Sequence, residues 1–275
     1  MAIEQERRAL AEALLPAVVE AGRIEMAYFV GAVEIERKAD ASPVTAADRD
    51  AEAVLLAALA EAAPSVPVVA EEEVAAGQVP AIGDTFFLVD PLDGTREFID
   101  RRPEFTINIG LVTGGQPVFG IVYAPASHRF YLGLGTGAAY QARLDPARGT
   151  ASLAACDLQP IATRVPDQRA LVVMDSRSHR SPETEAFLAR YDVASATHIG
   201  SSLKFCLIAA GEGDLYPRLG PTCEWDTAAA HAVLAAAGGS VTTLDGAPLV
   251  YGKAGARFLN PHFVAWGRGP LPPAR

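Results

Sequence analysis

Apolar and polar residues recur along the chain with the periods of helices and strands, and together they predict a mixed α/β protein. Residues 4 to about 30 are rich in Ala, Leu, Glu and Val at mixed helical spacing, so they predict a long helix disturbed near Pro16. Residues 33–38 alternate apolar and charged side chains, as a half-exposed strand does. A second helix is predicted to begin near residues 43–45 and to end before Pro64, which cannot continue it.

The central pattern is a run of four apolar residues, 86–89, that stops abruptly at polar residues. Four β-favouring residues in a row indicate a strand buried on both faces, and Pro91 cannot extend its hydrogen-bond ladder. We therefore expect this strand to end at Asp90. The turn at 93–95 supplies a capping residue, a glycine and a hydroxyl, and it leads into a predicted short helix over 96–99.

The rest of the chain supplies shorter segments of the same two kinds. Glycine and proline turns separate apolar segments in the first half, which predicts an antiparallel meander, whereas the second half alternates strand and helix signals. The polar segment 142–168 separates two halves, which we place at 1–150 and 151–275. The predicted strands are 67–70, 105–112, 117–123, 130–134, 170–174, 194–198 and 214–218, and the predicted helices are 181–190, 201–210 and an Ala-rich helix over 224–237.

Asp90 and Asp93 are the first candidates for chemistry. Two carboxylates this close repel each other unless a cation lies between them or one is protonated, and oxygen ligands without nearby His or Cys suit Mg²⁺. Free amides at the start of the following helix favour an anion, so the stretch is typical of a metal and phosphate site. The alternative is that Asp90 ends a strand and Asp93 caps a helix in an ordinary turn.

Two further acidic positions allow both a functional and a structural interpretation. Glu71 follows the strand at 67–70, where open α/β sheets place their ligands, and would join the two aspartates on a metal. However, it opens a run of three glutamates, and such runs are usually solvated loops. Asp48 would orient a water or a weakly held metal, or it would only complement the dipole of the second helix.

Composition restricts the class of protein. The chain has 275 residues, 50% of them hydrophobic and 20% charged, so it is globular and could form one large domain or two joined halves. Its net charge of −10 argues against a protein that binds nucleic-acid backbones. Three scattered cysteines suggest neither a disulfide framework nor a zinc site, and neither a signal peptide nor a long apolar run is evident. We expect a cytoplasmic protein without stable membrane insertion, and peripheral association with the inner membrane is left open.

Two motifs in this order resemble a known family. The segments Asp-Pro-Leu-Asp-Gly-Thr at 90–95 and Trp-Asp-Thr-Ala-Ala at 225–229 resemble the paired signature of the lithium-sensitive, magnesium-dependent phosphatases that include inositol monophosphatase. The resemblance implies a layered αβαβα sandwich of the inositol monophosphatase and fructose-1,6-bisphosphatase type. A narrower resemblance, to the bacterial 3'(2'),5'-bisphosphate nucleotidase branch known as CysQ, is carried by the stretches 38–48, 200–206, 216–222 and 249–253.

This resemblance implies a role for each candidate residue. The carboxylates of Glu71, Asp90, Asp93 and Asp226, with the backbone carbonyl of Leu92, would bind Mg²⁺. Asp48 and Thr95 would position the attacking water, Glu72 would be a further catalytic carboxylate, and the amides of Gly94 and Thr95 would hold the phosphate. The nucleotide contacts would come from His179, Ser201, Lys204 and Arg218.

Two positions depart from the family pattern. Ala70 stands where a Ser often precedes the paired glutamates, and His231 stands where this branch often has Gln. Neither change removes a candidate ligand. We expect His231 to be a histidine of a helix face or of the core.

The function implied by the resemblance is that of an Mg²⁺-dependent phosphomonoesterase, a 3'(2'),5'-bisphosphate nucleotidase. Its partner would be a small phosphorylated nucleotide, adenosine 3',5'-bisphosphate, with 3'-phosphoadenylyl sulfate as a second candidate substrate. Lys204 and Arg218 offer cationic contacts for a second phosphate, which inositol monophosphate lacks. The alternatives are an inositol monophosphatase, a broad sugar phosphatase, and a sensor that binds metal and nucleotide without catalysis. A monomer and a homodimer are both left open.

Overall fold

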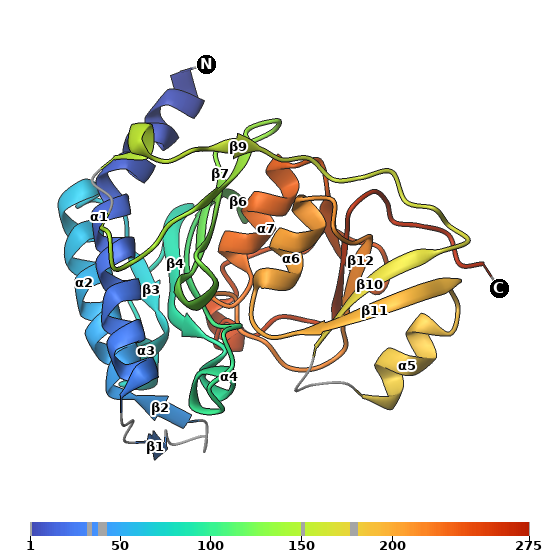
Figure 1. Cartoon of the computed structure of the whole chain (residues 1–275), viewed down its shortest axis with the longest axis horizontal. Helices are drawn as coiled ribbons and strands as arrows, with labels where there is room; N and C mark the ends of the chain where they lie inside the picture. The colour runs from blue at the N-terminus through green and yellow to red at the C-terminus, as the bar shows by residue number, and fades with distance from the viewer. Residues whose placement is uncertain (1, 32–34, 38–42, 150–151, 177–180, 275) are drawn as a thin grey trace.

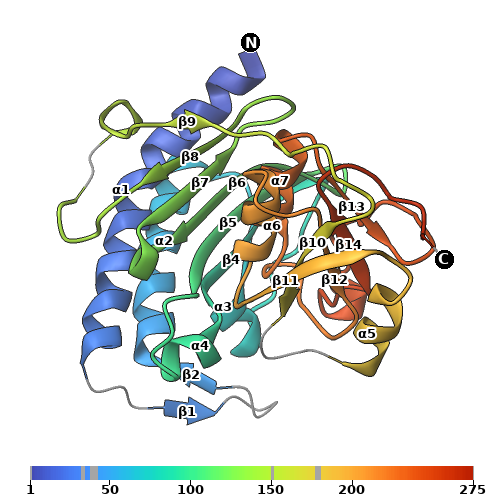
Figure 2. The ribbon, with the colours of Figure 1, turned by 45° about the vertical axis from the view of Figure 1, so that its right-hand side comes forward.

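The elements of the chain stack in five layers. The structure, a computed structural model, describes residues 2–31, 35–37, 43–149, 152–176 and 181–274. The layers are helices, sheet, helices, sheet and helix, so the predicted αβαβα sandwich is confirmed (Figure 1, Figure 2). The first layer contains α1 (Ala2–Val30) and α2 (Ala46–Ala62), the middle layer α6 (Leu203–Ala209) and α7 (Ala228–Ala236), and the last layer α5 (Pro182–Leu188).

The two sheets between these helices differ in topology. The seven-stranded sheet has the order β3-β4-β5-β6-β7-β8-β9 and is antiparallel except for the pair β3 and β4, whereas the five-stranded sheet, β11-β10-β12-β14-β13, is mixed. The strands of the first are β3 (Val68–Ala70), β4 (Thr85–Asp93), β5 (Thr106–Thr113), β6 (Gln116–Ala124), β7 (Arg129–Gly133), β8 (Ala139–Arg143) and β9 (Gln159–Pro160). Those of the second are β10 (Leu171–Ser176), β11 (Val193–Ile199), β12 (Leu215–Arg218), β13 (Ser240–Thr243) and β14 (Phe263–Trp266). The short elements are the pair β1 (Ile35–Arg37) and β2 (Pro43–Thr45), and the helices α3 (Glu71–Ala75) and α4 (Thr95–Ile99).

Strand β4 is buried on both faces, as its apolar run predicts. Phe87 and Val89 pack in the core under α1 and α2, whereas Phe86 and Leu88 pack in the core that contains α6 and α7. The prediction that the strand ends at Asp90 is wrong. Pro91 interrupts the ladder, but pairing with β5 resumes after a register shift, and β4 continues to Asp93.

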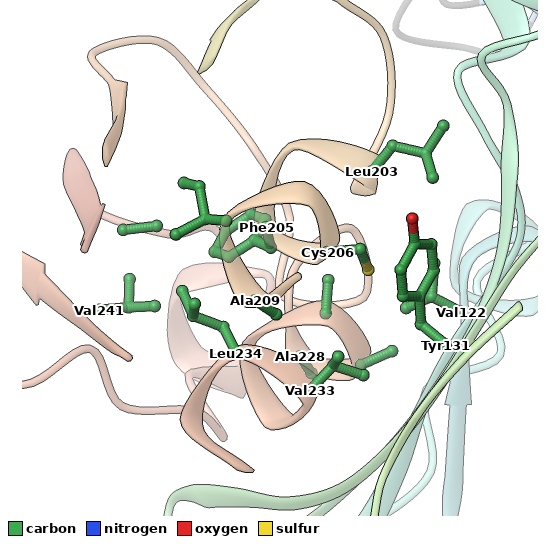
Figure 3. Packing of buried hydrophobic residues seen from close by; sticks show 14 of the residues in the cluster. Val122, Tyr131, Leu203, Phe205, Cys206, Ala209, Ala228, Val233, Leu234 and Val241 are labelled. Atoms are coloured by element: carbon green, nitrogen blue, oxygen red, sulfur yellow. The ribbon is translucent and has the colours of Figure 1, made fainter. Parts of the chain in front are cut away.

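Helix α7 lies unusually close to the first sheet because three glycines form a row across β5, β6 and β7. Gly110, Gly120 and Gly133 are paired neighbours, and a Cβ atom on Gly120 would lie 2.0 Å from the carbonyl oxygen of Ala229. The alanines predicted to allow close approach of this helix therefore meet glycines on the sheet. Figure 3 shows the resulting core, in which Val233 of α7 and Cys206 of α6 face the sheet residues Val122 and Tyr131.

Most other predicted elements are present, but the strands β2, β8, β9, β13 and β14 and the helix α3 were not predicted. The first two helices, the meander and the alternating second half are confirmed, and Pro16 lies within the continuous helix α1. β9 lies in the polar segment 142–168, which shows little periodicity. β9 still pairs with β8, so the first sheet continues beyond residue 150, and the division into halves stays a prediction. Among the described residues, no helix is both long and apolar enough to cross a membrane.

Candidate active site

Glu71 and Asp90 are neighbours because β3 and β4 run parallel and end at the same edge of the sheet. Ala70 is paired with Val89, so the next residue on each strand lies at the same level. Side chains alternate along β4, which places Asp90 on the face shared with Phe86 and Leu88, the face toward α7. Only 1% of Asp90 is exposed, and its Oδ1 accepts the amide of Leu92 at 3.0 Å.

Asp226 reaches this edge from the turn before α7. Its Oδ2 accepts the amide of Cys223 at 3.0 Å, which fixes the carboxylate at the start of the helix. Glu71, Asp90 and Asp226 each offer an oxygen atom, and the three atoms lie within 4.8 Å of one another. The three carboxylates therefore converge on one point, although Glu71 and Asp226 lie 155 positions apart in the sequence.

Electrostatics shows why this cluster suits a cation. Burial raises the pKa of Asp90 well above its ordinary value, and the charges of Glu71, Asp93 and Asp226 raise it further. Burial and the charges of Asp93 and Glu71 raise the pKa of Asp226 in the same way. A divalent cation with a preference for oxygen ligands would remove this repulsion. The donor set fits such an ion.

The turn after β4 brings the next group of predicted residues together. Gly94 adopts a left-handed conformation, with φ of 95°, and Thr95 then opens α4. Thr95 Oγ1 lies 3.2 Å from the carbonyl oxygen of Leu92 and 3.4 Å from Asp48 Oδ1. Asp48 is 2% exposed, and its Oδ2 accepts both the amide and the hydroxyl of Thr45, at 2.8 and 2.7 Å. Asp48 is thus fixed behind Thr95.

The opposite side of the site carries buried cations. Lys204 of α6 is 4% exposed, donates to the carbonyls of Ile199 and Ser201, and lies 5.1 Å from the ring centre of Tyr216. Burial lowers the pKa of Lys204 to about 8, while the charge of Asp93 raises it and that of Arg218 lowers it.

Arg218 of β12 is held in place by two hydrogen bonds. It is 7% exposed and donates to Ser176 Oγ at 3.2 Å and to the carbonyl of Pro221 at 2.7 Å. Its Nε atom is buried and has no hydrogen-bond partner among the described residues. A buried cation with a free donor is suited to an anionic ligand.

One cavity of about 250 Å³ connects these groups. The predicted residues that line it are Glu71, Asp90, Leu92, Asp93, Gly94, Thr95, Ser201, Lys204, Arg218 and Asp226. Asp48 is joined to it through Thr95, whereas Glu72 is not among its lining residues. His179 lies outside the described residues. The roles assigned to these residues stay predictions.

Several residues of the site were not predicted from the sequence. Glu97, Ser176 and Tyr216 line the cavity, and Ser202 joins α6 to the first sheet by donating to Asn108 Oδ1 at 2.7 Å. Glu52 of α2 accepts the amides of Glu72 and Glu73, and burial raises its pKa to about 7. The only sequence signal for Glu52 was its spacing of four residues from Asp48, which places both on one face of a helix.

His231 is a buried core histidine, as predicted, and lies behind the start of α7. Its Nδ1 lies 3.0 Å from the hydroxyl of Tyr251, which donates to Thr227 Oγ1 at 3.2 Å; the Thr227 hydroxyl donates to the carbonyl of Glu224. The Tyr251 hydroxyl uses its proton in the hydrogen bond to Thr227, so its oxygen accepts a hydrogen bond from the Nδ1–H group of His231. Burial lowers its pKa to about 3, so the ring is neutral near pH 7.

The fold and this arrangement of carboxylates agree with comparisons to known proteins. The sequence pattern of the inositol monophosphatase family matches residues 6–263. The chain belongs to the inositol monophosphatase family. This membership confirms the resemblance carried by the motifs at 90–95 and 225–229, and it makes the protein a phosphatase of a metal-dependent family.

Individual members of the family resemble the chain over most of its length. A protein named 3'(2'),5'-bisphosphate nucleotidase CysQ from Escherichia coli (strain K12) is 44% identical over 231 residues, 84% of this chain and 88% of that protein. A protein of the same name from Salmonella typhimurium is 43% identical over 245 residues, 88% of this chain and 94% of that protein. The crystal structure of CysQ from Bacteroides thetaiotaomicron has a TM-score of 0.77 at 35% identity, covering 95% of this chain and 98% of that one.

Proposed function

We propose that the protein hydrolyses adenosine 3',5'-bisphosphate to AMP and phosphate with Mg²⁺ as cofactor. The observation that carries this proposal is the presence of opposite charges in one cavity, carboxylates on one side and the buried cations Lys204 and Arg218 on the other. The carboxylates suit a metal that binds the reacting phosphate, and the cations suit a second anionic group of the same substrate. The names of the relatives with 43–44% identity support this choice.

The proposed metal ligands are the carboxylates of Glu71, Asp90, Asp93 and Asp226 and the carbonyl of Leu92. Bound there, Mg²⁺ supplies Lewis acidity, which lowers the pKa of a water molecule and neutralises charge on the phosphoryl oxygens. The amides of Gly94 and Thr95 are proposed to donate to the phosphate, because Gly94, with φ of 95°, and Thr95 stand at the start of α4, where amides lack partners within the helix.

The attacking water is proposed to be oriented by Thr95 and Asp48. Asp48 is fixed by two hydrogen bonds from Thr45 and contacts the Thr95 hydroxyl, so the pair is rigid enough to hold a water in line with the phosphorus. The bond from phosphorus to the ribose 3'-oxygen breaks and the bond from phosphorus to the water oxygen forms, while the proton of the water passes through the Thr95 hydroxyl to Asp48. The ribose 3'-oxygen leaves and takes up a proton from solvent water. Glu72 stays a further candidate carboxylate.

The substrate preference is proposed to come from Lys204 and Arg218, with Ser201 beside them. The second phosphate of the nucleotide would accept a hydrogen bond from Arg218 Nε. This bond would replace no existing one, because that atom has no hydrogen-bond partner among the described residues. A sulfated phosphate at the same place makes 3'-phosphoadenylyl sulfate a second substrate candidate. Cys156, Cys206 and Cys223 form no disulfide in the described residues, which agrees with the proposed location in a reducing cytoplasm.

Phosphate release tests the proposal. Adenosine 3',5'-bisphosphate and inositol 1-phosphate are each incubated with the protein and Mg²⁺, with a chelator in place of Mg²⁺, and with the Asp93→Asn variant. We expect Mg²⁺-dependent release that is faster from the bisphosphate and absent in the variant. Preference for inositol 1-phosphate would identify an inositol monophosphatase instead, and tight binding of the bisphosphate without release would identify a sensor.

A further inference from the structure

The start of α3, which carries Glu71, is held by a side chain from another helix. The amide of Glu72 donates to Glu52 Oε2 at 2.9 Å, and the amide of Glu73 donates to Glu52 Oε1 at 3.0 Å. Glu52 belongs to α2 and is 4% exposed. The first amides of a helix lack partners within the helix, and a side chain at the N-cap usually accepts one of them. Ala70 occupies that position in α3 and makes no such bond.

Side-chain packing holds α3 only weakly, since its one contact with the core cluster among the hydrophobic residues is the partly buried Val74. The helix spans five residues, Glu71–Ala75, and none of them is buried. A helix this short is unstable by itself, and it has little apolar burial to resist fraying. The direction of the Glu71 carboxylate therefore depends on the hydrogen bonds that hold this turn. Glu52 supplies two of them.

Helix α2 connects this turn with the other side of the site. Asp48 and Glu52 are separated by four residues, so they lie one above the other on the same face of α2. Asp48 contacts Thr95 after β4, and Glu52 binds the turn after β3. One helix thus sets the relative position of a residue proposed to orient water and of a proposed metal ligand.

We propose that Glu52 is a positioning residue of the metal site. Its two hydrogen bonds fix the turn that begins with Glu71, and this fixed geometry sets the affinity of the carboxylate cluster for a divalent cation. Side chains that orient metal ligands commonly change affinity or activity by 10- to 100-fold when they are removed. The inference deepens the proposed function, since it concerns the same metal, but it is tested by binding rather than by turnover.

The experiment measures binding of Mn²⁺ by electron paramagnetic resonance, without substrate. In Glu52→Gln the side chain keeps its shape, but one amide then faces an NH₂ group, so we expect binding about tenfold weaker than in the wild type. Glu52→Met removes both acceptors and is expected to bind more weakly still. Glu61→Gln is the matched control, because Glu61 lies exposed on the same helix and loses the same charge. It is expected to change affinity less than about twofold.

A second substitution separates hydrogen bonding from charge. Ala70→Ser places a hydroxyl at the N-cap, where it accepts the amide of Glu72 or Glu73. We expect it to leave the wild type unchanged and to restore about threefold of the affinity lost in Glu52→Gln. Circular dichroism and thermal unfolding in chelator verify that each variant is folded.

Three results would overturn the proposal. These are unchanged Mn²⁺ binding in Glu52→Gln and Glu52→Met, an equal loss in Glu61→Gln, and a loss that Ala70→Ser does not relieve, since Glu52 would then act through its charge. Phosphate release is measured separately. A wild type that binds Mn²⁺ but releases no phosphate refutes the proposed function, and the binding series still decides the role of Glu52.

Discussion

The two sides of the cavity carry opposite charges and need opposite partners. On the acidic side, burial and mutual repulsion raise the pKa values of Asp90 and Asp226. The ionised forms of these carboxylates therefore cost free energy until a cation binds between them. On the cationic side, burial lowers the pKa of Lys204 to about 8, and Arg218 retains a buried donor without a partner. Each side of the cavity therefore carries buried charge that lacks full compensation. A metal ion would compensate the acidic side, and an anionic substrate group would compensate the cationic side.

The two sides also differ in how the chain supplies them. Glu71 follows β3 and Asp90 lies in β4, two neighbouring parallel strands of the seven-stranded sheet, whereas Lys204 and Arg218 come from α6 and β12. Asp226 lies later in the chain than Lys204 and Arg218 but belongs to the acidic side. The comparison shows that neither residues 1–150 nor residues 151–275 alone supply all the residues that line the cavity.

The largest expected effect comes from the acidic side. Asp90→Asn should lower kcat on the order of 1,000-fold, because a metal that contributes several kcal/mol to the barrier reduction loses a buried ligand. The same variant should have a higher melting temperature than the wild type in chelator. The raised pKa of Asp90 means that its ionised form destabilises the fold above the ordinary carboxylate pKa, and Asn removes that charge.

Asp84→Asn is the control for this variant, because Asp84 is exposed just before β4 and loses the same charge. We expect neither kcat nor the melting temperature in chelator to change measurably in this control. The value of kcat is obtained from phosphate release, and the melting temperature from thermal unfolding of the same samples. Lower stability of metal-free Asp90→Asn would contradict the interpretation of the acidic side as a repulsive cluster.

The cationic side is tested with Arg218→Met. Loss of a buried cation that binds an anion should cost about 2–3 kcal/mol, which is about 30- to 150-fold in kcat/KM for adenosine 3',5'-bisphosphate. For p-nitrophenyl phosphate, which has a single phosphate, the change should stay below about threefold. Steady-state kinetics with both substrates measures the difference. Arg148→Met, at a side chain that is 86% exposed, serves as the charge-matched control.

If Arg218→Met lowered kcat/KM equally for both substrates, the cation would act on the reacting phosphate or on the fold. The division of the cavity into a metal side and a second-anion side would then be incorrect.

Mg²⁺ should stabilise the wild type against heat. At a concentration about 100 times the dissociation constant, an ion that binds only the folded protein contributes about 2.7 kcal/mol. For a chain of this size that corresponds to a rise in Tm of about 5–10 °C, measurable by differential scanning fluorimetry. The rise should vanish in Asp90→Asn. An equal rise in that variant would show that Mg²⁺ binds elsewhere.

The smallest expected effect concerns His231 of α7, the helix that begins just after Asp226. The pKa of His231 is about 3 in the folded protein and near 6.5 ordinarily, so the unfolded chain binds a proton that the folded chain excludes. Stability should therefore fall as the pH drops below about 6.5, by about 2 kcal/mol at pH 5. His231→Gln should reduce this loss, as measured by urea unfolding in chelator at pH 8 and pH 5.

His262→Gln is the matched control, because His262 is exposed. We expect the same pH dependence as in the wild type. A pH dependence that His231→Gln leaves unchanged would assign the loss of stability to other groups.

Much of the fold and most of the candidate site could be predicted from local patterns. The run 86–89 predicts a strand buried on both faces because four apolar residues in a row must face two cores, and Phe86 and Phe87 do pack in different ones. The motifs at 90–95 and 225–229 predict the family because each combines an aspartate with a characteristic set of neighbouring residues, and both occur in the order that the family shows. The strand end at Asp90 was wrong, since a proline breaks one ladder bond but does not prevent pairing from resuming.

Other features left no local signal. β9 is two residues long and pairs with a neighbouring strand without any apolar alternation of its own. Glu52 resembled an ordinary helix-face glutamate, because its partners are backbone amides about twenty positions away. Such contacts depend on how α2 packs beside β3, which residue spacing does not encode.

The periodic elements, the residue types at each turn and, through two motifs, the family can all be read from the sequence. These depend on steric preferences and on residues close together along the chain, so they can be read without knowing the packing. The packing of the folded chain brings Glu71, Asp90 and Asp226 together, buries Lys204 and Arg218 in the same cavity, and places Glu52 against the amides of α3. Convergence and burial arise when the two sheets close around α6 and α7, because that packing sets distances between residues far apart in the chain.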